Sequence, residues 1–311
     1  MAIPAENLDP SSARRTQQIS VCICTLKRPE LLSRTLASLE NQQTDGLFTY
    51  AVVVADNDCR QSAEEVVAAF SSATPMPVTY CVEPQQNIAL ARNKAIENAT
   101  GDFIAFIDDD EFPASDWLLN LFKTCKSYGV DGVLGPVKPY FEAEPPRWVK
   151  KGGFFERPCY ATGHKVSWGI CRTGNVLFRK SILDGIEEVF RPQFNTAGED
   201  VDFFRRFMTD GCTFIWCNEA VAYEVVPAWR CTRVYLLKRA LLRGSNFPKH
   251  PSHRIRNIVK SLLAVPAYAL ILPFLALFGH HVFLKYLIKL LDHASRLFAF
   301  LGLSLVSQRQ T

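Results

Sequence analysis

Short apolar runs alternate with amphipathic segments through the first third of the chain, and this alternation constrains the fold more than any other feature. The apolar runs have the length of buried strands and occupy residues 19–24, 48–56, 77–82 and 103–107. Helical patterns lie between them, beginning at Pro29, Ala63 and Ile88. Strands that alternate with helices at this spacing predict βαβ units, and therefore an α/β fold with a mostly parallel sheet flanked by helices.

The rest of the chain continues this pattern less regularly. It predicts helices at 117–128 and about 199–210, a strand and turn at 130–140, a strand leading into a helix at 175–179, and strands at 212–217 and 220–226. Residues 139–172 are rich in Gly, Pro and aromatic residues and show no clear periodicity. An irregular segment of that length inside a compact domain is usually functional, so we expect it to shape a binding site.

The composition suits one large domain, or one domain with an appendage, because the 311 residues are 48% hydrophobic. The net charge of +4 gives no reason to expect nucleic acid as a partner. The ten cysteines form no Cys-x-x-Cys pair, so we expect reduced, buried thiols and neither a zinc site nor a disulfide framework. Residues 1–18 are polar, with no apolar stretch of signal-peptide length, and predict a disordered tail on a cytosolic start.

Three of the predicted strands end in residues that can do chemistry. Thr25, with Arg28 shortly after it, ends the first strand, and Asp56 ends the second. The fourth is followed by four consecutive acids, Asp108 to Glu111. Ligands of open parallel sheets bind beyond the carboxyl ends of the strands. We therefore expect these residues to share one site.

The run of acids points to a divalent cation. Clustered carboxylates at the end of a buried strand repel one another and lose hydration. Mg²⁺ or Mn²⁺ relieves both costs, and these ions bind one or two protein carboxylates together with substrate phosphates. The alternative is a solvated, acidic helix start with no ligand.

Neighbouring residues extend this hypothesis to a nucleotide. The Asp56 carboxylate can accept the N3–H of a uracil ring, and the Arg92 guanidinium can reach phosphate or ribose oxygens. Asn87 stands at the start of the helix that carries Arg92. Taken singly, each of these residues can equally be an ordinary surface or capping residue.

The order of motifs resembles that of family-2 glycosyltransferases of the GT-A fold, over about residues 19–226. The motifs are ISVCICTLKRPELLSRTLASL, VVVADND, PQQNIALARNKAIENATGDFIAFIDDDEF, TGNVLFRKSIL and GEDVDFF. NIALARN, FIDDDE, VLGPVKPYF, PPRW and AGEDVDFF are similar more narrowly to bacterial exopolysaccharide glucosyltransferases of the succinoglycan-assembly type.

The resemblance implies a nucleotide-sugar donor of the UDP-sugar class, with UDP-glucose as one candidate. The donor-binding residues would be Thr25, Arg28, Asp56, Asn87, Arg92, Asp108 and Asp109. Asp108 and Asp110 match the family's D-x-D pair, which holds Mg²⁺ or Mn²⁺ on the diphosphate.

For catalysis, the resemblance implies a general base in AGEDVDFF. Glu199 and Asp200 lie in the first turn of that predicted helix, and the family pattern places the base on the second acid, Asp200. One displacement by an acceptor hydroxyl then inverts the sugar. The alternative is an acidic helix start with no chemistry. Trp148, Gly174 and Asn175 are the candidate acceptor residues.

The chain departs from the family pattern in two places. After the base it reads LLKRALLRG, without the Gln-x-x-Arg-Trp segment of processive synthases, so we expect addition of a single sugar. Glu224 stands where many relatives carry a histidine. Four arginines follow, and they either clamp a diphosphate or belong to a solvated or lipid-facing basic helix: Arg230, Arg233, Arg239 and Arg243.

The C-terminal part raises the question of a membrane. Residues 258–278 are nearly all apolar and would span about 31 Å as a helix, close to the ~30 Å hydrocarbon core of a bilayer. Residues 282–306 place their charges on one face, which is typical of an interfacial helix or a helix packed in a bundle. A pair of buried soluble helices is the alternative.

These patterns together divide the chain into a tail (1–18), a GT-A glycosyltransferase domain (19–230), a basic helical linker (231–256) and a membrane-associated helical hairpin (257–311). The basic residues before the apolar segment favour a catalytic domain on the cytoplasmic side of the inner membrane. A lipid-linked glycan acceptor for a bacterial surface polysaccharide fits that position.

Two rival functions remain open on the sequence alone. A nucleotidyltransferase of related fold would usually carry a Gly-rich phosphate loop after the first strand, and CTLKRPELL lacks it. A catalytically inactive membrane adaptor would not need Asp108, Asp110 and Asp200, which this chain retains.

Overall fold

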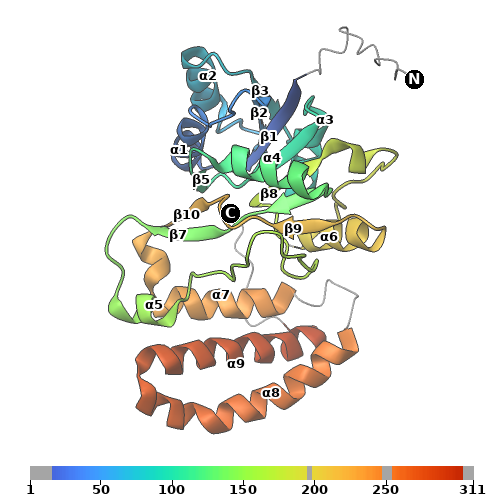
Figure 1. Cartoon of the computed structure of the whole chain (residues 1–311). Helices are drawn as coiled ribbons and strands as arrows, with labels where there is room; N and C mark the ends of the chain where they lie inside the picture. Colours follow the sequence, from blue (N-terminus) through green and yellow to red (C-terminus); the bar gives the residue numbers. More distant parts are fainter. Residues whose placement is uncertain (1–15, 195–197, 247–253, 304–311) are drawn as a thin grey trace, which may run out of the picture.

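A computed structural model describes residues 16–194, 198–246 and 254–303, and it contains two sheets, a set of flanking helices and a separate layer of three helices (Figure 1). The predicted tail, part of the predicted linker and the end of the predicted hairpin lie outside the described residues, as does Ala197 of AGEDVDFF.

The larger sheet has seven strands in the order β3-β2-β1-β4-β8-β6-β9. Its strands are β1 (Gln17–Thr25), β2 (Phe48–Asp56), β3 (Val78–Val82), β4 (Phe103–Ile107), β6 (Gly132–Leu134), β8 (Asn175–Arg179) and β9 (Phe214–Trp216). β8 pairs antiparallel with both of its neighbours, and the other pairs are parallel. The predicted mostly parallel sheet is confirmed.

Helices cover both faces of this sheet, because the inner strands are apolar on both sides. The flanking helices are α1 (Pro29–Leu39), α2 (Glu64–Ala73), α3 (Ile88–Glu97), α4 (Trp117–Tyr128) and α6 (Glu199–Thr209). α1, α2 and α4 bury their apolar faces in one core cluster, and α3 and α6 bury theirs in the other. β8 is followed by a short 3₁₀ helix, Lys180–Leu183, where the sequence predicted a longer helix.

A smaller sheet carries the acidic run away from the main sheet. It has the order β5-β10-β7, formed by β5 (Glu111–Pro113), β10 (Ala222–Val226) and β7 (Val137–Phe141). The last of the four acids, Glu111, is therefore a strand residue, and it pairs with Glu224 in the antiparallel register of β5 and β10. The long segment 139–172 continues from β7 through the short helix α5 (Arg147–Gly152).

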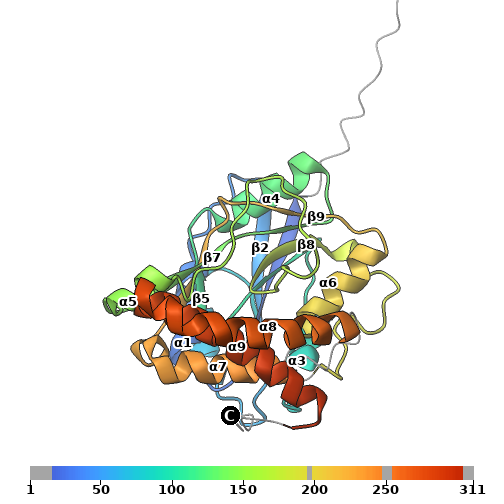
Figure 2. The same cartoon turned by 90° about the horizontal axis from the view of Figure 1, so that it is seen from below.

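Three helices form a layer under the domain: α7 (Arg233–Asn246), α8 (Arg254–Leu275) and α9 (His280–Phe300) (Figures 1 and 2). α9 packs closely on α7, where Ser295 Oγ donates a 2.6 Å hydrogen bond to the Leu241 carbonyl. A β-carbon on Gly244 would lie only 2.6 Å from the Asp292 carbonyl oxygen, so glycine permits this approach. On its other side, α9 contacts α8, where Ser261 Oγ lies 2.9 Å from His293 Nδ1.

α8 leaves much of its apolar surface uncovered. Among the described residues it is the one helix long and apolar enough to cross a membrane, over Asn257–Phe278. The mean hydropathy of this segment is 2.2, and only 6% of its apolar stretch is buried. Leu270, Phe274 and Leu277 are 74%, 64% and 84% exposed. Asp292 of α9 faces α7, where Arg243 Nε lies 3.0 Å from Asp292 Oδ1, whereas Lys285 and Lys289 of α9 are exposed. This arrangement matches the alternative of a helix packed in a bundle.

The start of α6 is fixed by an aromatic cluster. Phe203 is fully buried, and its ring lies 4.9 Å from that of Phe190 and 5.5 Å from that of Phe178, measured between centroids. Glu199 and Asp200 occupy the first turn of the same helix, so this packing also positions the two acids.

Replacement of Phe203 by alanine should lower the free energy of unfolding by about 3–5 kcal/mol, because it empties the centre of this cluster. Urea denaturation followed by tryptophan fluorescence measures the change. The exposed Leu47 serves as the control, and Leu47→Ala should cost less than about 1 kcal/mol. Equal losses for the two variants would contradict the packing described here.

Candidate active site

The carboxyl-end edge of the main sheet brings the predicted strand-end residues together. Thr25 pairs with Asp56 in the parallel register of β1 and β2. Thr25 Oγ1 also donates a 2.8 Å hydrogen bond to Asp109 Oδ2, across a sequence separation of 84 residues. The first strand end and the acidic run therefore form one site.

Arginine side chains lie between the acids of this site. Arg28 Nη1 is 3.2 Å from Asp109 Oδ1 and 3.5 Å from Asp110 Oδ2. Arg230 reaches Asp110 from the other side, with Nη2 3.3 Å from Oδ2, and its Nη1 is 3.0 Å from Glu224 Oε1. Each guanidinium thus bridges two carboxylates.

A third arginine links the acidic run to the predicted base helix. Arg92, on α3, is buried, and its Nη1 donates to Glu199 Oε1 at the start of α6. Its Nη2 lies 3.8 Å from Asp108 Oδ1. Removing one member of a buried ion pair leaves an uncompensated charge, so Arg92 is needed to hold both acids where they are.

Glu111 is the acid with the least compensation. Its side chain is 1% exposed, and neither carboxylate oxygen has a hydrogen-bond partner within the part of the chain that the structure describes. The nearest cation is Arg157, with Nη1 3.9 Å from Oε1, and Arg157 also donates to Glu224. A β-carbon on Gly174 would lie 2.9 Å from both Asp108 Oδ2 and Glu111 Oε1, so Gly174 packs directly against these two carboxylates.

Burial raises the pKa of several of these carboxyl groups. The Asp108 side chain is 47% exposed, but it lies deep among protein atoms, and this desolvation raises its pKa to about 7, against the pull of Arg92 and with help from Asp110. Desolvation likewise raises the pKa of Glu111, of Asp109 against Arg28, and of Glu199 against Arg92. A bound cation would lower such pKa values.

The donor set fits a cation that is shared with a substrate. Among the residues that the structure describes, no group of three or more His, Cys, Asp and Glu side chains could hold a metal ion alone. Mg²⁺ and Mn²⁺ in phosphate-transferring sites use one or two carboxylates and complete their shell with phosphate and water oxygens. Asp108 and Asp110 supply that number, and the buried carboxyl group of Glu111 lies next to Asp108.

Asp200 lies beside this cluster with its own arginine. Its Oδ2 is 3.6 Å from Arg172 Nε, and its side chain is 15% exposed. The adjacent Glu199 is turned toward Arg92, so the two acids of the pair have different surroundings. Of the two, Asp200 is the one whose cationic neighbour lines a cavity.

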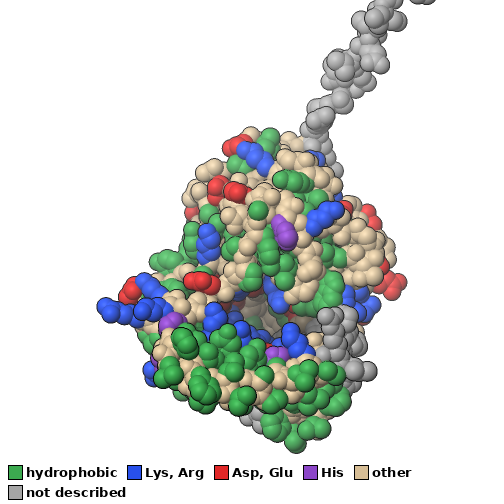
Figure 3. Space-filling view, turned by 60° about the horizontal axis from the view of Figure 1, so that its bottom comes forward, with side chains coloured by type: hydrophobic (Ala, Val, Ile, Leu, Met, Phe, Trp, Pro, Cys, Tyr) green, Lys and Arg blue, Asp and Glu red, His purple; other side chains and the backbone are tan. Residues whose placement is uncertain are grey.

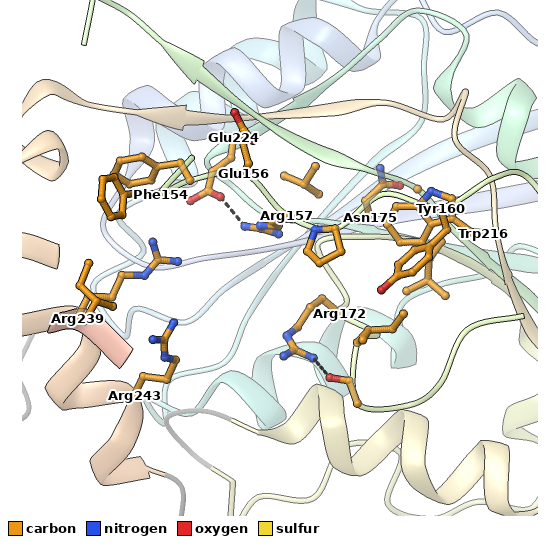
Figure 4. Close-up of a pocket in the computed structure, with 18 of the residues that line it drawn as sticks. Phe154, Glu156, Arg157, Tyr160, Arg172, Asn175, Trp216, Glu224, Arg239 and Arg243 are labelled. Atoms are coloured by element: carbon orange, nitrogen blue, oxygen red, sulfur yellow. Dashed lines mark hydrogen bonds and ion pairs between the residues drawn. The ribbon is translucent and has the colours of Figure 1, made fainter. Parts of the chain in front are cut away.

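That cavity has a volume of about 450 Å³ and opens between the domain and the helical layer (Figures 3 and 4). Arg157, Arg172 and Asn175 line its domain side, and Arg239 and Arg243 of α7 reach it from below. Four aromatic side chains complete much of the wall: Phe154, Phe155, Tyr160 and Trp216. The cavity therefore adjoins the candidate base on one side and the helical layer on the other.

Three other predicted site residues make bonds that support the fold. Asp56 is fully buried and accepts hydrogen bonds from Ala63 N at 2.8 Å and Tyr80 OH at 2.9 Å. Asn87 caps α3 by accepting from Ala89 N at 3.0 Å. Asn175 Oδ1 accepts from the indole N–H of Trp117 at 2.8 Å. Their roles toward a ligand remain predictions.

Trp148 lies on α5 and packs against Phe154 and His280, with ring centroids 5.6 and 5.5 Å away. Arg233 lies over the same indole, 5.7 Å from the ring centroid. Trp148 therefore lies at the contact between α5 and the start of α9, beside a residue of the cavity wall. Its role as an acceptor residue remains a prediction.

Sequence reasoning missed Arg157 and Arg172, which contact the acidic residues of the site. Both belong to the segment 139–172, which the sequence marked as functional by its length and irregularity alone. No periodicity or motif indicates which of its residues face a site. Glu111 was noticed as part of the acidic run, but its burial comes from strand β5, which the sequence did not predict.

The fold and the family both follow from comparisons with known proteins. Residues 20–186 match the family model "Glycosyl transferase family 2", which is more than half of the chain. The chain therefore belongs to glycosyl transferase family 2, and the resemblance inferred from its motifs is confirmed.

Among individual proteins, the chain is 36% identical over 231 residues to the succinoglycan biosynthesis protein ExoM of Rhizobium meliloti (strain 1021), covering 74% of each chain. It is 24% identical over 203 residues to the glycosyltransferase AglE of Haloferax volcanii, covering 65% of each. A crystal structure of S. aureus TarS 1-349 in complex with UDP has a TM-score of 0.53 and 16% identity, over 91% of this chain and 90% of that one. This last likeness confirms the GT-A-like fold.

Gly174→Ala should destabilise the protein by about 1–3 kcal/mol, because the added methyl group displaces two carboxylates, one of which is fully buried. The matched control is Gly169→Ala, whose β-carbon would meet nothing within 4 Å. Urea denaturation of both variants measures the difference. Equal stability of the two alanine variants would show that the carboxylates move away freely.

Proposed function

We propose that this protein transfers one sugar, with inversion, from a UDP-sugar to a lipid-linked glycan during synthesis of a bacterial surface polysaccharide. The observation that carries the proposal is the junction of three parts in one place. The first part is the run of acids from Asp108 to Glu111 at the sheet edge, which forms ion pairs with arginines. The second is the pair Glu199 and Asp200 at the start of α6. The third is the cavity that opens toward the helical layer.

The donor half of the proposal rests on the acidic cluster. UDP is the ligand of TarS in the similar structure, and a uridine nucleotide is the donor part that we assign here. Thr25, Arg28 and Asp109 form one hydrogen-bonded unit that would hold the nucleoside and the start of the diphosphate. Asp108 and Asp110 would hold Mg²⁺ or Mn²⁺, which when bound neutralises the charge that develops on the leaving diphosphate.

The acceptor half rests on Asp200. This carboxylate would take the proton from an acceptor hydroxyl as that oxygen attacks the anomeric carbon, and a single displacement inverts the configuration. Such general base assistance contributes about 10²- to 10⁴-fold to the rate. Glu199 is held by Arg92, so it positions the first turn of α6 against Asp108. Arg172 orients Asp200 from the cavity side.

The biological setting is inferred from the similar proteins and the helical layer. ExoM is a succinoglycan biosynthesis protein, and an exopolysaccharide role with a hexose donor, such as UDP-glucose, is the corresponding proposal for this chain. The exposed apolar surface of α8 supports association with a membrane. Nucleotide sugars are cytoplasmic, so we place the catalytic domain on the cytoplasmic side of the inner membrane.

Nucleotide binding tests the two halves separately. Calorimetric titration with UDP should show binding that requires Mn²⁺ and that falls at least about tenfold in Asp110→Ala, because a metal-bridging carboxylate is lost. Asp200→Asn should bind UDP like the wild type but transfer sugar about 10²- to 10⁴-fold more slowly. Binding and turnover of a nucleoside triphosphate would favour the nucleotidyltransferase, and no nucleotide binding at all would favour the inactive adaptor.

Membrane association is tested on α8. Leu270→Glu combined with Phe274→Glu should reduce co-sedimentation with phospholipid vesicles, because charged groups are costly to bury in the acyl region. The control pair is Leu47→Glu with Ile186→Glu, which changes two exposed apolar residues of the domain (45% and 40% exposed). If the control pair loses as much binding as the α8 pair, α8 is not the membrane-binding surface.

A further inference from the structure

Two arginines of α7 have no role in the site described so far. Arg239 and Arg243 lie four residues apart on one helical face and both line the cavity. In Figure 4 they point into it from the helical layer, while Tyr160, Trp216 and Asn175 lie on the opposite side. Like charges at this spacing destabilise a helix by a few tenths of a kcal/mol, so packing alone does not favour the pair.

The charges in the cavity are balanced at one end and unbalanced at the other. On the domain side, Arg157 is paired with Glu224, and Arg172 faces Asp200. On the α7 side, Arg239 is exposed and has no ion-pair partner among the described residues. Arg243 shares its partner Asp292 with Arg296. The α7 wall of the cavity is therefore positively charged, and the lining on the domain side also includes the exposed carboxylate of Glu156.

The cavity wall changes character along its length in the same direction. Tyr160, Trp216 and Asn175 lie on the side away from α7 and suit a sugar ring, whereas the aromatic ring of Phe154 lies toward Arg239 (Figure 4). Leu236 and Ile288 lie near the helical layer and are apolar. A ligand that matches this wall has a sugar at one end, an anionic group in the middle, and an apolar chain that leaves along the helical layer.

We propose that the cavity binds the junction between the glycan and the lipid of the acceptor, and that Arg239 and Arg243 bind its phosphate groups. This proposal rests on the proposed function, because it takes the sugar acceptor to be lipid-linked. Arginine suits this task, since its planar fork of N–H donors matches phosphate oxygens two at a time. The donor diphosphate is a separate ligand, held at Asp108 and Asp110.

The test uses farnesyl diphosphate as the probe, with the full-length protein in a neutral detergent and with EDTA to disable metal-dependent binding at the acidic cluster. Farnesyl diphosphate should bind, and Arg239→Gln combined with Arg243→Gln should weaken binding at least about tenfold, because two charge-assisted contacts are lost. Farnesol, which lacks phosphate, should not bind. Inorganic pyrophosphate should compete with the probe.

The matched control is Lys238→Gln combined with Lys285→Gln. These two lysines are exposed, lie in the same helical layer and do not line the cavity, so the net charge changes equally. The control should weaken binding by less than about threefold, as is typical of exposed charges. Thermal unfolding of both double variants shows that each is folded.

Three results would overturn the proposal: no binding of farnesyl diphosphate to the wild type, equal losses in the two double variants, or displacement of the probe by phosphatidylglycerol vesicles. The last result would identify a general site for lipid headgroups. UDP binding with Mn²⁺, measured on the same preparations, separates this proposal from the function. If UDP binds and the probe does not, the acceptor site alone is wrong. If the probe binds and UDP does not, the transferase function is wrong and the phosphate site stands.

Discussion

The ion pairs of Arg92 are the interaction on which the rest of the site depends. This one buried side chain connects Asp108, at the end of β4, with Glu199, at the start of α6, although Arg92 and Glu199 are 107 residues apart in the sequence. Without a cation at that point, two desolvated carboxylates would face each other in the interior, and their mutual repulsion would favour separation of α6 from the sheet. Arg92 thus fixes the distance between the acidic run and the candidate base.

Three other arginines also form ion pairs with more than one carboxylate around the acidic run. Arg28, Arg157 and Arg230 each contact at least two carboxylates, and each comes from a different part of the chain. A buried carboxylate cluster is stabilised by cations placed between its members, from the protein or from solution, or by protonation. Glu111 has the most distant cationic partner of the four acids, Arg157 at 3.9 Å, which fits a site that an additional cation completes.

The parts of this molecule that could be predicted from sequence are those specified by local patterns. The strands and helices from β1 to α4, except β5, follow from apolar periodicity, from Pro29 at a helix start and from Asn87 at another, so their bounds agree with the structure within a few residues. Thr25 and the four acids were placed together because parallel strands end at one edge.

The parts that could not be predicted depend on contacts between distant segments. Arg157 and Arg172 come from a segment with no periodicity, and only the folded chain shows that they face Glu224 and Asp200. Antiparallel pairing of β8 with β4 also has no local signal, since it is set by which strand edge is left free. Burial of Glu111 depends in the same way on β10, more than a hundred residues further along the chain.

The distribution of arginines also determines which surface the helical layer presents to the cavity. Arginines close to the candidate catalytic acids form ion pairs with them, so they stabilise the folded site. Arg239 and Arg243 on α7 do not form ion pairs with these acids, so the α7 face remains positively charged. α9 holds α7 in place through Ser295 and Asp292. The same packing that turns the apolar face of α8 outward therefore turns the basic face of α7 toward the cavity. One helical layer thus presents an apolar surface on one side and a positive surface on the other, and the lipid-linked acceptor that we propose would contact both.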